Sequence, residues 1–459
     1  MPIQKYKRLA YENLNEFVYG QSKKPVTLKN GMVIGGGLIY PELNFTMPTM
    51  LITQESMPEV LRQYKEIVEG ACKRAVELYS HGFVAEVELL PPTTYHPEWG
   101  IDIIKTVKDV LNNYEQKRGL KSAIRLTPVD IREDKKSPHM WHGSHWEAIL
   151  KTFEGGARAG ADFLAIESIG GKDIHDEANM YCEIGKSIFA LGVLGTKDMS
   201  KFWSEIVRIA ENTGTIASGD TACGFANTAM VLADRGMVPK LYAAVDRVIS
   251  GVRSLVAIEE GAKGPHKDCG YEGVYVKAIT GTPISMEGKT SACAHLSPVG
   301  NIAACVADLW SNESVQNIKL LGGMAPTVYY EQLEYDCRLM NQAAKSGNAI
   351  MMRNWLADSD SALDPQAYVL RPDVVIDISR EIIKGDTYLK RSIIAAKITI
   401  DRLRKAIDNN EVRVDARELS WLDVMDAKID KIPDDEEQFI KNMVEENESE
   451  KFVPSKYDL

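Results

Sequence analysis

Short apolar runs alternate along this chain with longer segments whose apolar positions recur every three or four residues. Residues 56–79 and 101–116 have this helical spacing, whereas residues 83–90 and 123–128 are short apolar runs typical of buried strands. Because parallel strands are joined by crossover connections that are usually helices, the alternation predicts a parallel sheet with helices packed around it.

The length of the chain favours one fold with this alternation. Several strand and helix units can be recognised before residue 330, the last with a strand at 317–323, although not all eight strands can be placed. A (β/α)8 barrel needs about 250 residues, and the chain has 459, which would also allow two domains. We predict a (β/α)8 TIM-type barrel with additional helices at the N- and C-terminal ends. The expected parts are a lead-in at 1–50 with a glycine-rich hairpin, the barrel at 51–375, and C-terminal helices with an acidic tail packed on it at 376–459.

The ends of the chain differ in pattern. The glycines at 35–37 predict a bent strand or hairpin, because no helix follows them as in a phosphate-binding loop. Residues 392–407 have apolar positions at spacings of three and four, which predicts an amphipathic helix docked on its own barrel. The acidic residues of 434–459 predict a solvated tail.

Residues with metal-binding chemistry follow three of the apolar runs. Glu167 ends one apolar run, Cys223 follows a short covered strand, and Cys269 lies in a glycine-bracketed loop. They are separated by more than the roughly 30 residues of one βα unit, so they can lie on separate strands at the same end of a barrel. A buried Glu167 also needs a positive partner. One carboxylate and two thiolates can bind zinc and leave a fourth position for substrate.

Four segments around these residues are distinctive and occur in this order: DFLAIESIGGKD, SGDTACGFANTAM, GPHKDCGYEG and AITGTPISMEGKTSACAH. They resemble the zinc subunit of methanol:corrinoid methyltransferases, the methanol-specific methyltransferase 1 system of methanogens and acetogens. The resemblance extends from about residue 7 to at least residue 370. It implies that one zinc ion per chain is held by Glu167, Cys223 and Cys269.

The resemblance also implies a reaction and a partner. The family transfers the methyl group of methanol, activated on the zinc, to the reduced cobalt of a corrinoid that a separate protein carries. It implies a tight complex with that corrinoid-binding protein, built around a homodimer of this subunit within a heterotetramer. The chain has no D-x-H-x-x-G corrinoid motif. Asp220 is the candidate acid or the group that positions the substrate hydroxyl. An aspartate at this position would be explained equally well by capping of the next turn.

Other functions stay open at this point. A shell of one carboxylate and two thiolates weakens zinc as a Lewis acid, so a zinc-dependent alkyltransferase acting on a thiol or a methoxylated compound is the alternative. A structural zinc would need a fourth ligand, for which His175, His266 and Cys293 are candidates. A barrel hydrolase would need an H-x-H pair, and VAEVELLPP has none.

A histidine cluster offers a rival metal site. His139, His142 and His145 lie at spacings of three. Ser144 and Glu147 form a capping-box pattern for a helix at 146–157, which gives the turn a structural explanation. We expect these residues to lie near the barrel mouth.

Composition indicates the cellular compartment of the protein and the classes of partner that it excludes. The net charge of -11 argues against nucleic acid. No apolar run approaches 18 residues, and the N-terminus lacks an apolar signal core, so we expect no membrane association and a cytoplasmic location. Seven cysteines without a CxxC pair fit a reducing compartment. We expect four of them to lie in the core: Cys72, Cys182, Cys305 and Cys337.

Overall fold

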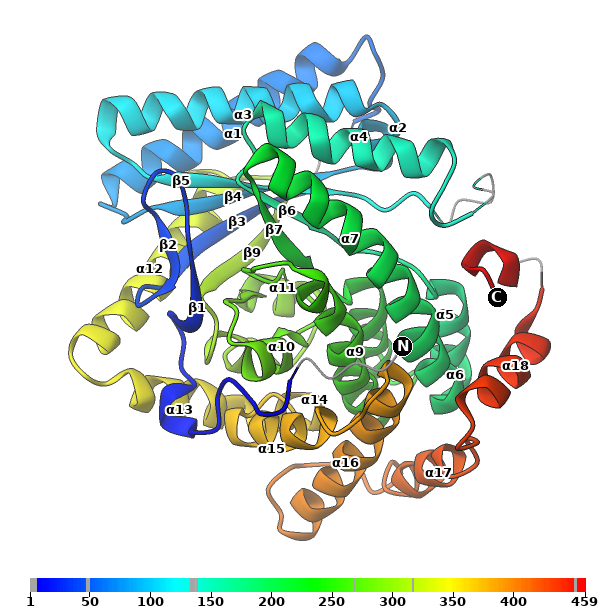
Figure 1. The fold of residues 1–459 in the computed structure, drawn as a ribbon. Helices are drawn as coiled ribbons and strands as arrows, with labels where there is room; N and C mark the ends of the chain where they lie inside the picture. The colour runs from blue at the N-terminus through cyan, green and yellow to red at the C-terminus, as the bar shows by residue number, and fades with distance from the viewer. Residues whose placement is uncertain are drawn as a thin grey trace.

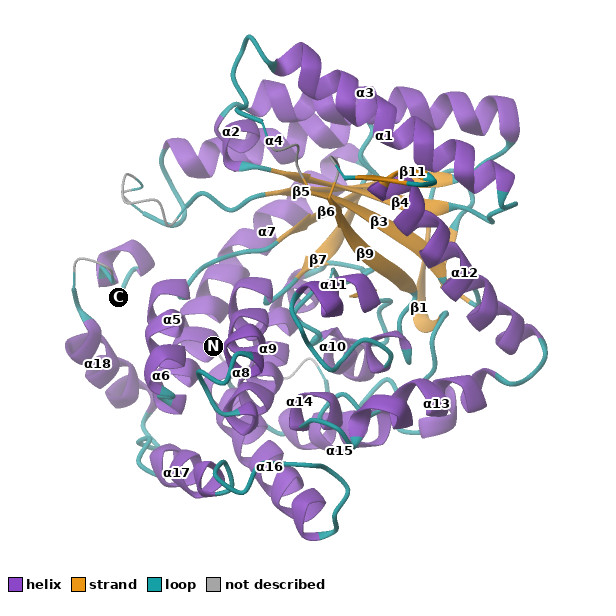
Figure 2. Cartoon of the chain, turned by 180° about the vertical axis from the view of Figure 1, so that it is seen from behind, coloured by secondary structure: helices purple, strands orange, loops and turns teal. Residues whose placement is uncertain are grey.

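The centre of the molecule is a seven-stranded sheet in which every neighbouring pair of strands is parallel. The computed structural model describes residues 6–46, 50–132, 137, 139–267, 269–315, 318–449 and 452–459. The strand order is β7-β6-β5-β4-β3-β9-β8, and Figure 2 shows the strands curling around one another. The bounds are β3 Tyr40–Thr46, β4 Phe83–Leu89, β5 Ser122–Pro128, β6 Phe163–Ile166, β7 Ile216–Asp220, β8 Ser285–Glu287 and β9 Leu309–Val315.

A short segment, 263–266, closes the sheet between its two edges. The Lys263 amide donates to the Ala217 carbonyl of β7 at 2.8 Å, and the Ser285 amide of β8 donates to the His266 carbonyl at 2.8 Å. This segment takes the place of the eighth strand, so the predicted TIM-type barrel is confirmed.

Helices cross from each strand to the next around the barrel. Figure 1 shows α1, α3 and α4 side by side over one side of the sheet, and α1 packs on α3 and α3 on α4. The crossover helices are α1 Met57–Glu77, α3 Pro97–Arg118, α4 Ser144–Ala159, α7 Thr196–Thr213, α9 Lys240–Glu260 and α10 Gly273–Thr280, and α12 Ala325–Lys345 follows β9. Shorter helices are added after the strands: α2 Pro91–Tyr95, α5 Lys172–Tyr181, α6 Ile184–Phe189, α8 Thr228–Asp234 and α11 Lys289–Ala294.

Helix α1 shows how the pattern produces the fold. Proline stands in its first turn, where the missing N–H is not needed. Val60, Tyr64 and Ile67 recur at spacings of three and four and are buried, which puts one apolar stripe against α3 and α12. The helices predicted from the spacing at 56–79 and 101–116 are therefore confirmed.

Two features of the strands differ from expectation. The hairpin of β1 Gln21–Thr27 and β2 Val33–Gly36 is present, but β3, the first barrel strand, also lies within the expected lead-in. The strand predicted at 317–323 is wrong, since β10 Lys319–Leu320 and β11 Gly323–Met324 form a small separate hairpin. Residue 317 lies outside the described residues, and β9 is the last barrel strand.

The C-terminal part of the chain is a layer of helices on the barrel. Its members are α13 Ala349–Ser361, α14 Pro365–Tyr368, α15 Pro372–Ile382, α16 Tyr388–Asp408, α17 Ser420–Ile429 and α18 Glu436–Asn447. Helix α16 packs against α9, as the spacing at 392–407 predicts. In the part of the chain that the structure describes, no helix is long and apolar enough to cross a membrane.

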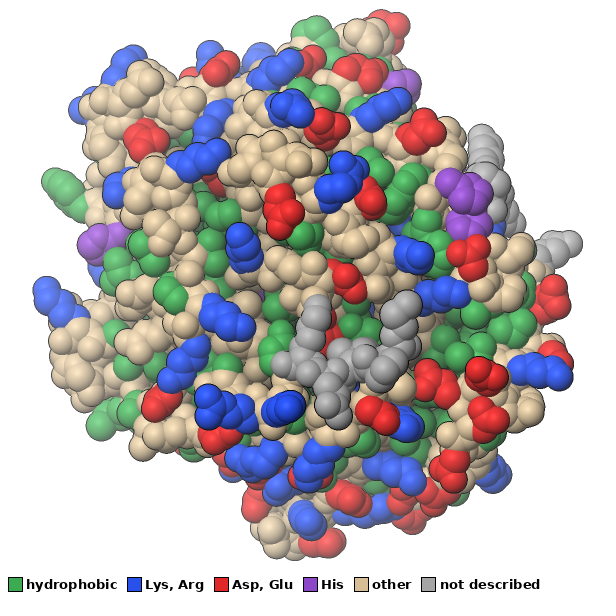
Figure 3. Space-filling view, in the orientation of Figure 1, with side chains coloured by type: hydrophobic (Ala, Val, Ile, Leu, Met, Phe, Trp, Pro, Cys, Tyr) green, Lys and Arg blue, Asp and Glu red, His purple; other side chains and the backbone are tan. Residues whose placement is uncertain are grey.

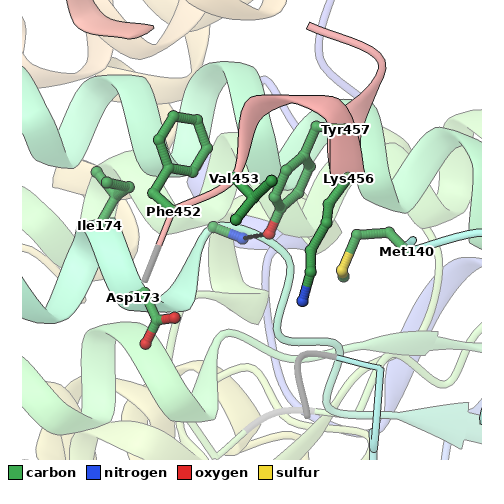
Figure 4. A pocket seen from close by; sticks show the side chains of 8 residues that line it. Met140, Asp173, Ile174, Phe452, Val453, Lys456 and Tyr457 are labelled. Atoms are coloured by element: carbon green, nitrogen blue, oxygen red, sulfur yellow. Dashed lines mark hydrogen bonds between the residues drawn. The ribbon is translucent and has the colours of Figure 1, made fainter. Parts of the chain in front are cut away.

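The last residues of the chain dock on the loops that follow β5 and β6. Phe452 and Tyr457 are buried, the Gly171 amide donates to the Tyr457 hydroxyl at 2.8 Å, and the Met140 amide donates to the Lys456 carbonyl at 3.2 Å. Figure 4 shows Tyr457 and Phe452 around the small pocket that they line with Met140. The expectation of a solvated tail is wrong here, because two aromatic side chains supply an apolar anchor.

The remaining side-chain expectations agree with the structure. Cys72, Cys182, Cys305 and Cys337 are buried and free. On the face shown in Figure 3, acidic and basic side chains are interspersed.

Candidate metal centre

Three neighbouring strand ends bring Glu167, Cys223 and Cys269 together. Glu167 follows β6, Cys223 follows β7, and Cys269 follows the closing segment. Their donor atoms all lie within 4.8 Å of one another, and the Cys269 Sγ lies 3.5 Å from the Glu167 Oε1. Because the carboxyl ends of parallel strands meet at one end of a barrel, residues far apart in sequence converge here.

The loop backbone is held in place by Thr221. Its hydroxyl accepts hydrogen bonds from the amides of Cys269 at 3.1 Å and of Gly270 at 3.3 Å. On the other side, the Asn227 Nδ2 lies 3.7 Å from the Cys223 Sγ. Both cysteines are thereby fixed by polar contacts to the chain just after β7.

Asp220 lies behind the three donors and is committed to other partners. Its buried carboxylate accepts from the Ser168 amide at 3.2 Å and from the Trp203 Nε1 at 2.9 Å, and the Arg253 Nη1 lies 3.4 Å away. Burial raises the pKa of Asp220 against the opposing effect of Arg253. These contacts tie the end of β7 to the residue after Glu167, which suits a positioning residue better than a proton donor.

Lys267 supplies the positive partner that Glu167 requires. Its ammonium lies 2.7 Å from the Glu167 Oε1 and 3.0 Å from the Glu86 Oε1, and 3.7 Å from Glu88. Burial opposes ionisation of Glu167, but the Lys267 charge and hydrogen bond outweigh it and hold the pKa of Glu167 below its usual range. Lys267 was not among the residues predicted from the sequence, although it lies two positions before Cys269 in the same glycine-bracketed loop.

Further carboxyl groups line the barrel around Lys267. In the strand register, Asn44 of β3 lies opposite both Glu86 of β4 and Glu313 of β9. Burial, together with the Glu167, Glu86 and Glu313 carboxylates, raises the pKa of Glu88 to about 8 against the effect of Lys267. Burial likewise raises the pKa of Glu313. The centre therefore has more carboxyl groups than it can ionise together.

Burial and nearby acidic groups also raise the pKa of both thiols at this centre. A hydrogen bond with Cys269 favours the Cys223 thiolate, but burial and Glu167 outweigh it and raise the pKa of Cys223 to about 12. Burial and Cys223 raise the pKa of Cys269 well above its usual value. A divalent cation reverses this because it favours the deprotonated ligand. Two sulfurs and one carboxylate oxygen are a donor set that fits zinc.

Among the described residues, no fourth histidine, cysteine or acid joins the group. The His175 Nε2 lies 3.0 Å from the Asp246 Oδ1. Both ring nitrogens of buried His266 lack a hydrogen-bond partner, and the Glu272 carboxylate is 3.8 Å away. Cys293 is exposed on α11. The three candidates for closing the site are therefore not part of this group.

The rival histidines do not converge. The His139 ring stacks on His142 with centroids 4.0 Å apart, while His145 packs against Tyr95 of α2 at 5.2 Å. The described residues of this loop form no metal-binding group; Pro138 lies outside them. The expected capping box is wrong, because α4 begins at Ser144 and its N-cap is Gly143, at φ 100°, with no side-chain hydrogen bond.

Comparison with known proteins extends over the whole chain. The family model described as methanol-cobalamin methyltransferase B subunit matches residues 3–458. A methanol–corrinoid protein co-methyltransferase of Methanosarcina barkeri is 36% identical, and the match covers 100% of both chains. A chain in the crystal structure of the methanol:cobalamin methyltransferase complex MtaBC from the same organism is 35% identical, with a TM-score of 0.94 and coverage of 100% of both chains. On sequence, fold and site geometry together, this chain belongs to the methanol-cobalamin methyltransferase B subunit family.

Proposed function

We propose that this chain transfers the methyl group of methanol to the reduced cobalt of a corrinoid on a partner protein, using one zinc ion bound by Glu167, Cys223 and Cys269. The convergence of these three donors within 4.8 Å carries the proposal. Family membership and the full-length similarity to a methanol–corrinoid protein co-methyltransferase support the reaction.

The zinc and the side chains around it have separate tasks. When bound, zinc supplies the Lewis acidity that polarises the carbon–oxygen bond of methanol. Glu167 and the two thiolates hold the ion, and Thr221 fixes the Cys269 loop through two amide hydrogen bonds. No further described acid, histidine or cysteine joins the group, and we assign the fourth coordination position to the alcohol.

The departing oxygen also needs a proton, and we assign Glu88 to provide it. Burial and the neighbouring carboxylates raise the pKa of Glu88 to about 8, which favours a protonated carboxyl near neutral pH. Its Oε1 lies 3.7 Å from the Lys267 ammonium, which also contacts Glu167. A donor whose pKa is close to the working pH suits general acid catalysis. Asp220 then acts behind the site as a positioning residue.

The corrinoid partner must reach the mouth of the barrel. Large apolar side chains are exposed after several barrel strands, namely Leu51 after β3, Leu296 after β8 and Leu321 after β9. Exposed apolar groups around a site are typical of a protein interface. A homodimer of this chain within a heterotetramer is the assembly that we propose with this partner.

The seven cysteines are free, which supports a cytoplasmic setting.

Metal analysis and methyl transfer together test this function. Purified protein should hold about one zinc per chain and methylate cob(I)alamin from methanol. Cys223→Ser and Cys269→Ser should lose both properties, whereas Cys293→Ser, exposed on α11, should keep them. Full zinc content and turnover in both site variants would remove the assignment.

A zinc-dependent alkyltransferase acting on a thiol or a methoxylated compound is the second candidate. The two sulfurs favour it, because a thiolate-rich shell weakens the Lewis acid that methanol requires. With free corrinoid as acceptor, this candidate predicts methyl transfer from the methylated thiol or methoxylated compound and none from methanol.

A further inference from the structure

Lys267 is a buried cation among acids at the proposed centre. Its side chain is only 3% exposed, and three carboxyl groups lie within 4.0 Å of its ammonium, those of Glu86, Glu88 and Glu167. The nearest is Glu167, one of the three proposed ligands. No substrate role in the proposed reaction requires this ammonium, so its place beside a ligand calls for a separate explanation.

A second buried cation, Arg125, already has its own partners. The Arg125 Nε lies 2.5 Å from the Glu42 Oε1, and its Nη1 donates to the Pro265 carbonyl at 2.9 Å. Among the ion pairs of the described residues, Lys267 is the cation that contacts the proposed ligand Glu167. The charge of the ligand shell is therefore balanced locally by one side chain.

The ligand shell has a formal charge that works against its chemistry. A dipositive zinc with one carboxylate and two thiolates carries a net charge of about -1, and sulfur donors further reduce its pull on an alcohol oxygen. An ammonium hydrogen-bonded to the carboxylate withdraws electron density from that ligand. Groups that contact metal ligands tune the metal in this way.

We propose that Lys267 is a positioning residue that offsets the negative charge of the ligand shell: its ammonium holds Glu167 in place and preserves the electron-withdrawing power of the bound ion. The inference rests on the proposed function, since it takes Glu167, Cys223 and Cys269 as the ligands. A lysine that merely filled space would leave the electronic state of the metal unchanged.

Cobalt(II) substitution measures that electronic state independently of turnover. In Lys267→Gln, which keeps a hydrogen-bond donor and loses the charge, the thiolate-to-cobalt charge-transfer bands should move to higher energy. In the zinc enzyme, kcat should fall by about 10- to 100-fold with little change in the KM for methanol. Lys267→Arg should restore the band position and most of kcat. Lys263→Met, exposed in the same segment, is the matched control and should match the wild type.

The contradicting results are equally specific. Unshifted bands with full kcat in Lys267→Gln, or an equal shift in folded Lys267→Arg, would overturn the role of the charge. If Lys267→Gln alone does not fold, Glu86→Gln/Lys267→Gln removes both members of a buried pair and permits the same comparison. Thiolate bands of undiminished intensity in both Cys223→Ser and Cys269→Ser would instead overturn the ligand set, which separates failure of the proposed function from failure of this inference.

Discussion

The indole nitrogen of Trp203 donates a 2.9 Å hydrogen bond to Asp220, so this carboxylate is held against helix α7. Asp220 also lies beside buried Arg253. Removing one member of a buried ion pair leaves the other unpaired, which costs about 3 kcal/mol or more. The contact network around Asp220 is therefore a stability element behind the metal centre.

Asp220→Asn should lower the unfolding temperature while the folded protein keeps its zinc and the pH profile of methyl transfer. Differential scanning calorimetry and metal analysis check this expectation. A proton donor would behave in the opposite way, with an unchanged unfolding temperature and a large loss of kcat. That outcome would return Asp220 to the chemistry.

Glu88 should set the alkaline limb of the reaction. The groups that face it are Lys267, Glu167, Glu86 and Glu313. Its pKa is raised to about 8, so the protonated donor is present below that pH and is lost as pH rises through it. Glu88→Gln should reduce kcat by about 100-fold and abolish this dependence. An alkaline limb that survives in Glu88→Gln would assign the proton to another group.

The sequence predicted the helices around the barrel better than the segment that closes its sheet. The helices around residues 56–79 and 101–116 were recognisable from apolar spacing alone. The eighth strand position was not, because the segment 263–266 is short and contains Pro265, which lacks an amide for the ladder. Strand β9 has four consecutive polar residues at 311–314, so it did not have the expected apolar pattern. One of them is Glu313, whose side chain lies among the interior acids.

The three proposed metal ligands could be chosen from the sequence, but the residues that contact them could not. Glu167, Cys223 and Cys269 could be chosen from residue type, spacing and resemblance, and the structure brings them together. Lys267 could not be chosen from one sequence, because its role depends on carboxylates from other strands. The docking of the acidic tail was not predicted for a related reason, since composition does not reveal that Phe452 packs against Phe189 of the distant helix α6.

Asp234 should make stability depend on pH. Burial, with the Asp364 carboxylate, raises its pKa to about 7 from 3.8. Because the folded-state pKa is raised, the ionised group lowers stability above pH 7, and this loss shrinks as pH falls toward 4. Asp234→Asn should raise the apparent unfolding temperature by about 2 °C at pH 8 and by less at pH 5. An equal gain at both values would contradict the titration, and Asp430→Asn at the exposed end of α17 is the control.

The docked C-terminus should contribute to stability near the site. Phe452 is buried and packs its ring against Phe189 with centroids 6.1 Å apart. Phe452→Ala should destabilise the protein by about 3 kcal/mol and expose the last residues to limited proteolysis. Leu459→Ala, at a partly exposed terminal residue, should do neither. Equal protease resistance of Phe452→Ala and the wild type would show that the tail is held by other contacts.

The most direct test of the account is the X-ray absorption spectrum of the zinc-loaded protein. The proposed centre predicts two sulfur neighbours at about 2.3 Å and oxygen neighbours at about 2.0 to 2.2 Å, with the oxygen shell changed by methanol. Cys223→Ser and Cys269→Ser should each remove a sulfur or the metal. A first shell of four protein donors that methanol leaves unaltered, or a shell without two sulfurs, would contradict the central claim.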